Sequence, residues 1–127
     1  MNKKFLLIII ALLLVLSGCS NQNLSLSLGE GIEDLEIINE KTNFEVGEPI
    51  YYFLESNKEF DTYNIEVVLY LKDTSGGFAI ADRITMDIDR EWNMFYNNNP
   101  IFLEPGEYKL QTRIDNETSI SKEFIVH

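Results

Sequence analysis

The sequence predicts an all-β protein. A single sandwich of about seven strands follows a short N-terminal segment that is helical at its start. Three observations support this prediction. From Leu35 onward apolar residues alternate with polar ones, turn residues interrupt the alternation about every ten positions, and helical periodicity is confined to the start of the chain. Short strands at this spacing are typical of β-sandwiches and barrels.

The first 18 residues have the layout of an export signal. Lys3 and Lys4 form a short cationic head, and residues 5–16 follow without a single polar side chain. This layout predicts a signal helix that is removed from the mature protein. The twelve apolar residues would form a helix of about 18 Å, whereas a bilayer core is roughly 30 Å thick. A permanent transmembrane span is therefore disfavoured.

The segment Leu16, Ser17, Gly18 and Cys19 resembles the lipobox of bacterial lipoproteins. The resemblance implies cleavage between Gly18 and Cys19 and a thioether-linked diacylglycerol on Cys19. The chain would then be exported and held by two or three acyl chains, such as palmitate, to the cell membrane, or to the outer membrane of a host with two membranes. Cys19 is the only cysteine, so no intramolecular disulfide competes for it. An ordinary secretory peptide or an uncleaved anchor, with Cys19 incidental, remains the alternative.

The rest of the chain is strongly acidic. Without its first 18 residues the chain of 127 keeps 109, which suits one domain and a short tether. Loss of Lys3 and Lys4 leaves eight of the ten basic residues against 21 acidic ones, a formal net charge of −13. Such a surface repels nucleic acid and anionic lipid headgroups. It either serves solubility alone or recruits a basic partner or divalent cations.

Residues 19–31 are predicted to form a lipidated cysteine and a flexible tether, and residues 32–127 the domain. The segment 20–31 is small, polar and glycine-punctuated. A flexible segment of that length has an r.m.s. reach of about 19 Å. The alternation of Leu24, Leu26 and Leu28 with serines leaves a first strand open as the alternative.

Six segments of the domain are predicted as its first strands and turns. Leu35–Ile38 is a short strand, Phe44 and Val46 precede a turn at Gly47, and Pro49–Leu54 is an aromatic strand. The clearest strand is 64–72, and a hairpin at 74–77 returns the chain through 78–88. Alternation assigns one face of each of the last two strands to the core: Ile65, Val67, Leu69 and Leu71 in the first, and Phe78, Ile80, Ile84, Met86 and Ile88, interrupted by Asp82, in the second.

The C-terminal part contains an irregular stretch and two more strands. Residues 92–102 hold aromatic residues and three consecutive asparagines, and are predicted to form a loop. Strands follow at 107–114 and 119–126. Their inward residues are predicted to be Tyr108, Leu110, Thr112 and Ile114 in the first, and Ile120, Phe124 and Val126 in the second.

The segment 103–110, with the sequence Leu-Glu-Pro-Gly-Glu-Tyr-Lys-Leu, resembles the entry to the penultimate strand of immunoglobulin-like sandwiches. There a tyrosine hydroxyl bonds back to upstream backbone, forming a tyrosine corner. The resemblance implies an immunoglobulin-like β-sandwich, with Tyr108 as the corner and Leu110 in the place of the second cysteine of antibody domains. It concerns the fold and implies no function.

The chain offers little catalytic chemistry. Its only histidine is the terminal His127, and no nucleophile elbow, phosphate-binding glycine loop or zinc signature is present. We therefore expect no enzymatic activity and no cofactor. Asp87, Asp89 and Glu91 alternate at a strand end, where they form either a solvated edge or a weak calcium site, and no glycine-bearing calcium loop surrounds them.

Four aromatic residues are candidates for a binding surface: Tyr51, Trp92, Phe95 and Tyr96. Together with the asparagines they would form a platform for a sugar or a peptide. In the alternative interpretation Trp92 and Phe95 plug one end of the sandwich.

The sequence thus favours a membrane-anchored, non-catalytic module that binds another protein or a glycan at the cell envelope. Two alternatives share the same fold and anchor. One is a structural accessory of a membrane complex, and the other is an inhibitor or immunity protein of an envelope hydrolase.

Overall fold

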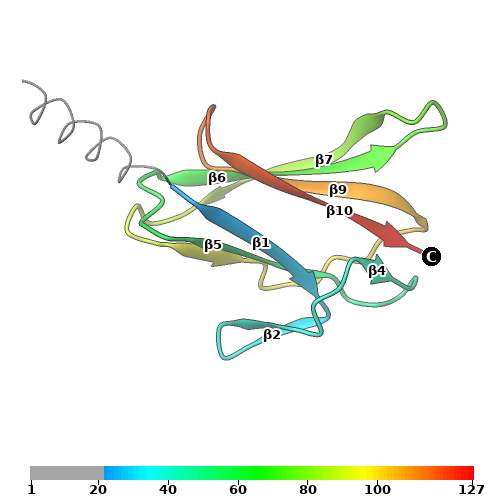
Figure 1. The fold of residues 1–127 in the computed structure, drawn as a ribbon, viewed down its shortest axis with the longest axis horizontal. Helices are drawn as coiled ribbons and strands as arrows, with labels where there is room; N and C mark the ends of the chain where they lie inside the picture. Colours follow the sequence, from blue (N-terminus) through cyan, green and yellow to red (C-terminus); the bar gives the residue numbers. More distant parts are fainter. Residues whose placement is uncertain (1–21) are drawn as a thin grey trace, which may run out of the picture.

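The computed structural model describes residues 22–127, and within them the chain is all-β, as predicted (Figure 1). The predicted signal helix, the cleavage site at Gly18 and the lipidation site at Cys19 lie outside the described residues. No helix that could cross a membrane is found between residues 22 and 127. The ten strands are β1 (Leu24–Gly29), β2 (Gly31–Glu33), β3 (Glu36–Ile38), β4 (Asn43–Phe44), β5 (Tyr51–Ser56), β6 (Asn64–Lys72), β7 (Phe78–Asp87), β8 (Met94–Tyr96), β9 (Gly106–Arg113) and β10 (Ser119–Val126).

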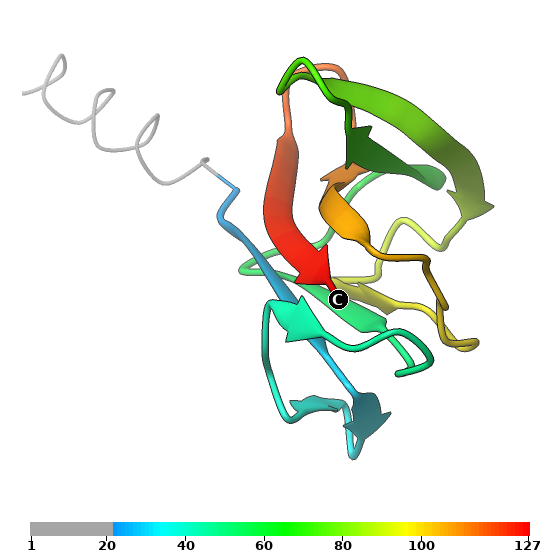
Figure 2. The same ribbon diagram turned by 90° about the vertical axis from the view of Figure 1, so that its right-hand side faces the viewer.

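Two sheets form a sandwich. One has three strands in the order β1-β5-β8, and the other has five in the order β4-β10-β9-β6-β7. Figure 2 shows them as two layers, with β1 and β10 on one side of the molecule and β7 on the other. The strands β2 and β3 form a separate hairpin. All pairings in the two sheets are antiparallel except the short parallel pair β4–β10.

The core lies between the two sheets and contains most of the predicted inward residues. Leu28 and Leu54 from the smaller sheet meet Ile65 from the larger one, and all three are fully buried. The predicted inward sets of β9 and β10 are confirmed, since their members are buried or packed against this cluster. Burial of an aliphatic side chain of this size stabilises the folded state by about 1.5–3 kcal/mol.

The prediction of a flexible tether through residue 31 is wrong from Leu24 onward. Residues 24–29 form β1, which pairs with β5 along its whole length and buries Leu26 and Leu28. The leucine–serine alternation suits a half-buried strand, and burial of the leucines favours that strand over a solvated tether. The folded domain therefore begins no later than Leu24, rather than at residue 32.

The end of β1 is closely packed against β3. A Cβ atom placed on Gly29 would lie 2.5 Å from the carbonyl oxygen of Ile38, so only glycine fits there. The strand predicted at Leu35–Ile38 begins one residue later, because Asp34 and Leu35 both have positive φ and form the hairpin turn between β2 and β3. This pair of angles is the one that two-residue hairpin turns of type I′ require.

The hairpin between β6 and β7 lies where the sequence places it. Gly76 has a φ of 92°, and a carboxylate oxygen of Asp73 accepts hydrogen bonds from the backbone N–H groups of Ser75 and Gly77 at 2.9 and 3.1 Å. The Ser75 hydroxyl also donates to Asp73, and this hydrogen bond is the main reason why the pKa of Asp73 is lowered. The turn is therefore built from local side-chain contacts.

The tyrosine corner is confirmed. The hydroxyl of Tyr108 donates a hydrogen bond to the backbone carbonyl of Glu104 at 2.8 Å, and its ring stacks on Phe124 at a centroid distance of 5.4 Å. Leu110, two residues further on, is buried in the core.

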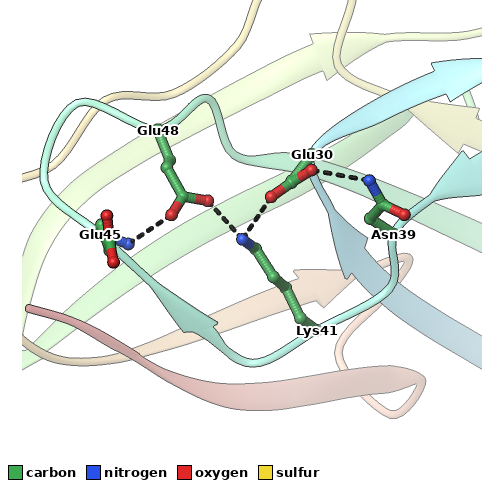
Figure 3. A network of polar contacts seen from close by, with 5 residues as sticks. All are labelled: Glu30, Asn39, Lys41, Glu45 and Glu48. Atoms are coloured by element: carbon green, nitrogen blue, oxygen red, sulfur yellow. Dashed lines mark hydrogen bonds and ion pairs between the residues drawn. The ribbon is translucent and has the colours of Figure 1, made fainter.

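A cluster of polar residues around Lys41 joins the end of β1 to the loop before β5 (Figure 3). The Lys41 ammonium contacts the carboxylates of Glu30, at 2.5 Å, and Glu48. Asn39 donates to Glu30 at 2.8 Å, and the backbone N–H of Glu45 donates to Glu48 at 3.1 Å. The hydrogen bond between Lys41 and Glu30 lowers the pKa of the Glu30 carboxyl group and raises the pKa of the Lys41 ammonium.

Candidate binding groove

A groove of about 1170 Å³ lies between the two sheets at the side where β7 and β8 are the outermost strands. Its floor consists of core side chains from both sheets. Around this floor the groove is bounded by β7, by β8 and by the loop that follows β8. The floor residues are Tyr52, Val67, Leu69, Phe95, Tyr108 and Leu110.

The groove is open because the larger sheet extends beyond the smaller one. Ile84 and Met86 lie opposite Val67 and Ile65 in the β6–β7 ladder, so they face the same side as these core residues. Their side chains nevertheless remain 48 % and 40 % exposed. The three-stranded sheet ends at β8 and leaves the inner face of β7 uncovered.

A β-bulge determines which residues of β7 face the groove. In the β6–β7 register Leu69 pairs with Asp82 and Tyr70 pairs with Ile80, which leaves Ala81 as the extra residue. The prediction that Ile80 and Ile84 share one face is therefore wrong. Ile80 lies on the outer face beside Tyr70, whereas Asp82 lines the groove.

The opposite wall begins with β8, which lies inside the stretch that was predicted as a loop. Asn97 fixes the chain after β8, because its side-chain oxygen accepts from the Tyr52 N–H at 2.8 Å. Its side-chain nitrogen donates to the carbonyls of Ile50 and Asn99 at 3.2 and 2.8 Å. Phe102 follows with an exposed ring that lines the groove. The asparagine run is thus an ordered wall.

The groove carries only negative formal charges. Among the described residues that line it, four are acidic, and none is lysine, arginine or histidine. Burial raises the pKa of the Tyr52 hydroxyl to about 12, so this group in the floor stays neutral at physiological pH. An apolar cleft lined by charges of one sign attracts ligands of the opposite sign. The four acidic residues are Asp82, Asp87, Glu91 and Glu104.

The predicted aromatic platform is divided by the fold. Trp92 lines the groove and is 44 % exposed, and Tyr96 also lines it while stacking on Phe53 at a centroid distance of 5.6 Å. Phe95 is 7 % exposed and packs against Tyr52 in the core. Phe95 is therefore a core residue, as the alternative interpretation predicts for it, whereas the exposed Trp92 does not plug the sandwich. Tyr51 lies opposite Gly29 in the β1–β5 ladder and does not line the groove.

The alternating acids at the end of β7 do not form a cluster that could hold a metal ion. Between residues 22 and 127 no three acidic or histidine side chains converge in that way. Asp87 and Glu91 line the groove instead. Asp89 lies in the following turn, where its carbonyl accepts from the Trp92 N–H at 3.1 Å.

Sequence reasoning missed Ile84, Met86 and Phe102 as residues of a site. The alternation of β7 assigned its aliphatic residues to the core, although the strand lies at the edge of its sheet. Asp82 and Arg83 in the middle of this strand were the available signal, because charged residues within an apolar strand are typical of sheet edges.

No protein-family model matches the chain, and a search of curated proteins finds no match either. Function is therefore inferred from the residues of the groove and from the N-terminal motif.

Proposed function

We propose that this chain is an exported, lipid-anchored and non-catalytic binding module. Its groove binds an apolar segment of another protein at the cell envelope, and this segment carries positive charge. The observation that supports the proposal most directly is the combination of an apolar floor with four acidic residues and no basic one. The lipobox resemblance at Leu16–Cys19 supports the proposed export and lipid anchoring at the cell envelope.

The size of the groove favours a polypeptide segment over a small molecule. Pockets for small ligands measure about 300–1,000 Å³ and enclose most of the ligand. The groove has about 1170 Å³ and is open along the sheet edge. Its lining contains no serine, threonine, cysteine or histidine among the described residues, which favours binding over nucleophilic chemistry.

Trp92 provides a direct test, because it is the only tryptophan of the chain and lines the groove. The full chain is reconstituted in phosphatidylcholine vesicles and titrated with a short peptide that carries valine and lysine at alternate positions with threonine between them, so that the valine and lysine side chains share one face of the extended peptide. We expect a saturable blue shift of Trp92 emission. A peptide with glutamate in place of lysine should produce no shift, because the groove acids repel it.

Two variants of β7 supply the matched control. Ile84→Asn removes an apolar side chain from the groove, whereas Ile80→Asn changes a side chain of similar exposure, 51 %, on the outer face. Binding of the lysine peptide should weaken only in Ile84→Asn. Equal binding by both variants, or no response of the unmodified chain, would overturn the proposed binding function.

The anchor is tested separately by the intact mass of the chain extracted from membranes. Cleavage before Cys19 and acylation predict the mass of 109 residues, counted from Cys19 to the end of the 127-residue chain, plus acyl groups. A Cys19→Ala variant should lack the acyl mass. An unmodified or uncleaved chain would contradict the proposed lipid anchor and leave the binding proposal to be judged by the fluorescence titration.

A further inference from the structure

The long free edge of β7 borders the groove. This strand is the last of the five-stranded sheet and runs for ten residues. No described strand pairs with the edge that points away from β6. An unpaired edge presents a row of backbone N–H and C=O groups that can pair with another strand.

The other edges of the two sheets are short or shielded. The strand β1 lies beside β10, where the Lys122 ammonium donates to the carbonyl of Leu26 at 3.4 Å. The strands β4 and β8 are only two and three residues long. Natural proteins protect sheet edges by such means, and β7 has only its bulge and its central charges.

The backbone groups that face the free edge can be assigned from the ladder. The N–H of Ile88 donates to the carbonyl of Tyr63 at 2.9 Å, so it points toward the β6 side. In an antiparallel pair these directions alternate, which turns the N–H groups of Thr85 and Asp87 toward the free edge. The N–H of Arg83 has the same orientation and donates to the side chain of Asp82 at 2.8 Å. The open part of the edge is therefore the second half of β7.

We propose that this part of β7 takes up an extended segment of the partner as an additional strand of the five-stranded sheet. The inference rests on the proposed function and specifies its mode of binding. Alternate apolar side chains of the added strand would cover Ile84 and Met86 and enter the groove. A basic side chain on that same face of the added strand would lie near Asp82, which faces the groove beside Ile84.

Charge complementarity selects a basic partner over a second copy of this chain. A second copy brings the same acidic surface, with a formal net charge of −11 for the full sequence. Like charges at an interface suppress association, whereas a basic segment gains from the groove acids. Main-chain hydrogen bonds provide affinity in this mode, and side-chain pockets provide specificity.

The variant Thr85→Pro tests strand addition without changing the groove side chains. Proline removes the N–H that faces the free edge and is tolerated at an edge whose N–H points to solvent. We expect the valine–lysine peptide to bind Thr85→Pro about tenfold or more weakly than the unmodified chain, because each main-chain hydrogen bond counts toward the affinity. Thr85→Ala keeps the N–H and should bind normally.

A second measurement does not depend on the proline variant. A peptide with a ¹³C-labelled backbone carbonyl should shift its amide I band to the position of paired β-strands when it binds the unmodified chain. Normal binding by Thr85→Pro, or a labelled band that stays unpaired, would overturn strand addition while the groove still binds peptide. No binding to the unmodified chain would instead refute the proposed function itself. Cross-linking of two copies through β7 in the absence of peptide would identify a second copy as the occupant and refute the basic partner.

Discussion

Removal of one hydroxyl group from the tyrosine corner should lower the stability of the domain by a defined amount. The change is Tyr108→Phe. The ring of Tyr108 stacks on Phe124 at an interplanar angle of 17°, and phenylalanine keeps this contact. The variant therefore loses only the hydrogen bond from the hydroxyl to the Glu104 carbonyl.

The size of the effect follows from the burial of that hydrogen bond. A typical intramolecular hydrogen bond contributes about 0.5–1.5 kcal/mol, so we expect the free energy of unfolding to fall by about 1 kcal/mol. For a domain of this size that loss lowers Tm by about 4 °C. Tyr70→Phe is the control, because the Tyr70 hydroxyl bonds at 3.1 Å to the side chain of Gln111 on the half-buried outer face. Its removal should have little effect.

The assay is urea unfolding followed by Trp92 fluorescence on the full chain. The midpoint of Tyr108→Phe should shift while the slope of the free energy with urea stays unchanged, since the surface exposed on unfolding is the same. A loss that equals that of Tyr70→Phe would refute the reasoning, because the corner would then contribute no more than a half-buried contact on the outer face.

Three further changes test other parts of the fold. Thr112→Val should raise the free energy of unfolding by about 1 kcal/mol in calorimetry, because the buried Thr112 hydroxyl has no hydrogen-bond partner among residues 22–127 and its desolvation is uncompensated. Gly29→Ala should cost about 2 kcal/mol or more in the same measurement through overpacking against the backbone of β3, whereas Gly31→Ala, whose Cβ would have its nearest neighbour at 3.6 Å, should cost much less. The pKa of Glu30 is lowered in the folded state, so the stability that its carboxylate contributes is present above the ordinary pKa of 4.5 and is lost as pH falls through the folded pKa. In that acidic range the Tm of the unmodified chain should therefore fall more steeply than the Tm of Lys41→Met.

The sequence predicts the sandwich well because its signals are local. Alternation fixes the inward face of β6, and the turn residues around Gly76 define the hairpin that follows. Tyr108 marks the corner through a contact only four residues away. Each of these features depends on neighbours in the chain, so a single sequence contains the information.

The order of strands within each sheet depends on contacts far apart in the sequence, and here prediction from the sequence fails. The alternation predicts that Ile84 in β7 and Val67 in β6 are both buried in the core. Ile84 is exposed because β7 lies at the edge of its sheet. The serines between Leu24 and Leu28 resemble a linker because their composition is polar, although the leucines are buried against the opposite sheet. The groove is a product of the unequal widths of the two sheets, which the apolar alternation of the strands does not encode.

The pairing of β1 also has a mechanical consequence. The strand starts at Leu24, and its six residues pair with β5 from Leu24–Ser56 to Gly29–Tyr51. Tension applied to the chain before Leu24, as an anchor at Cys19 would apply it, enters the domain at the first residue of β1. The component of such a load along the strand shears all cross-strand hydrogen bonds of the β1–β5 pair at once, whereas a component across the strand breaks them one after another. Pairing over its whole length therefore lets β1 resist a pull along the strand on the chain before Leu24 with six residues together rather than one by one.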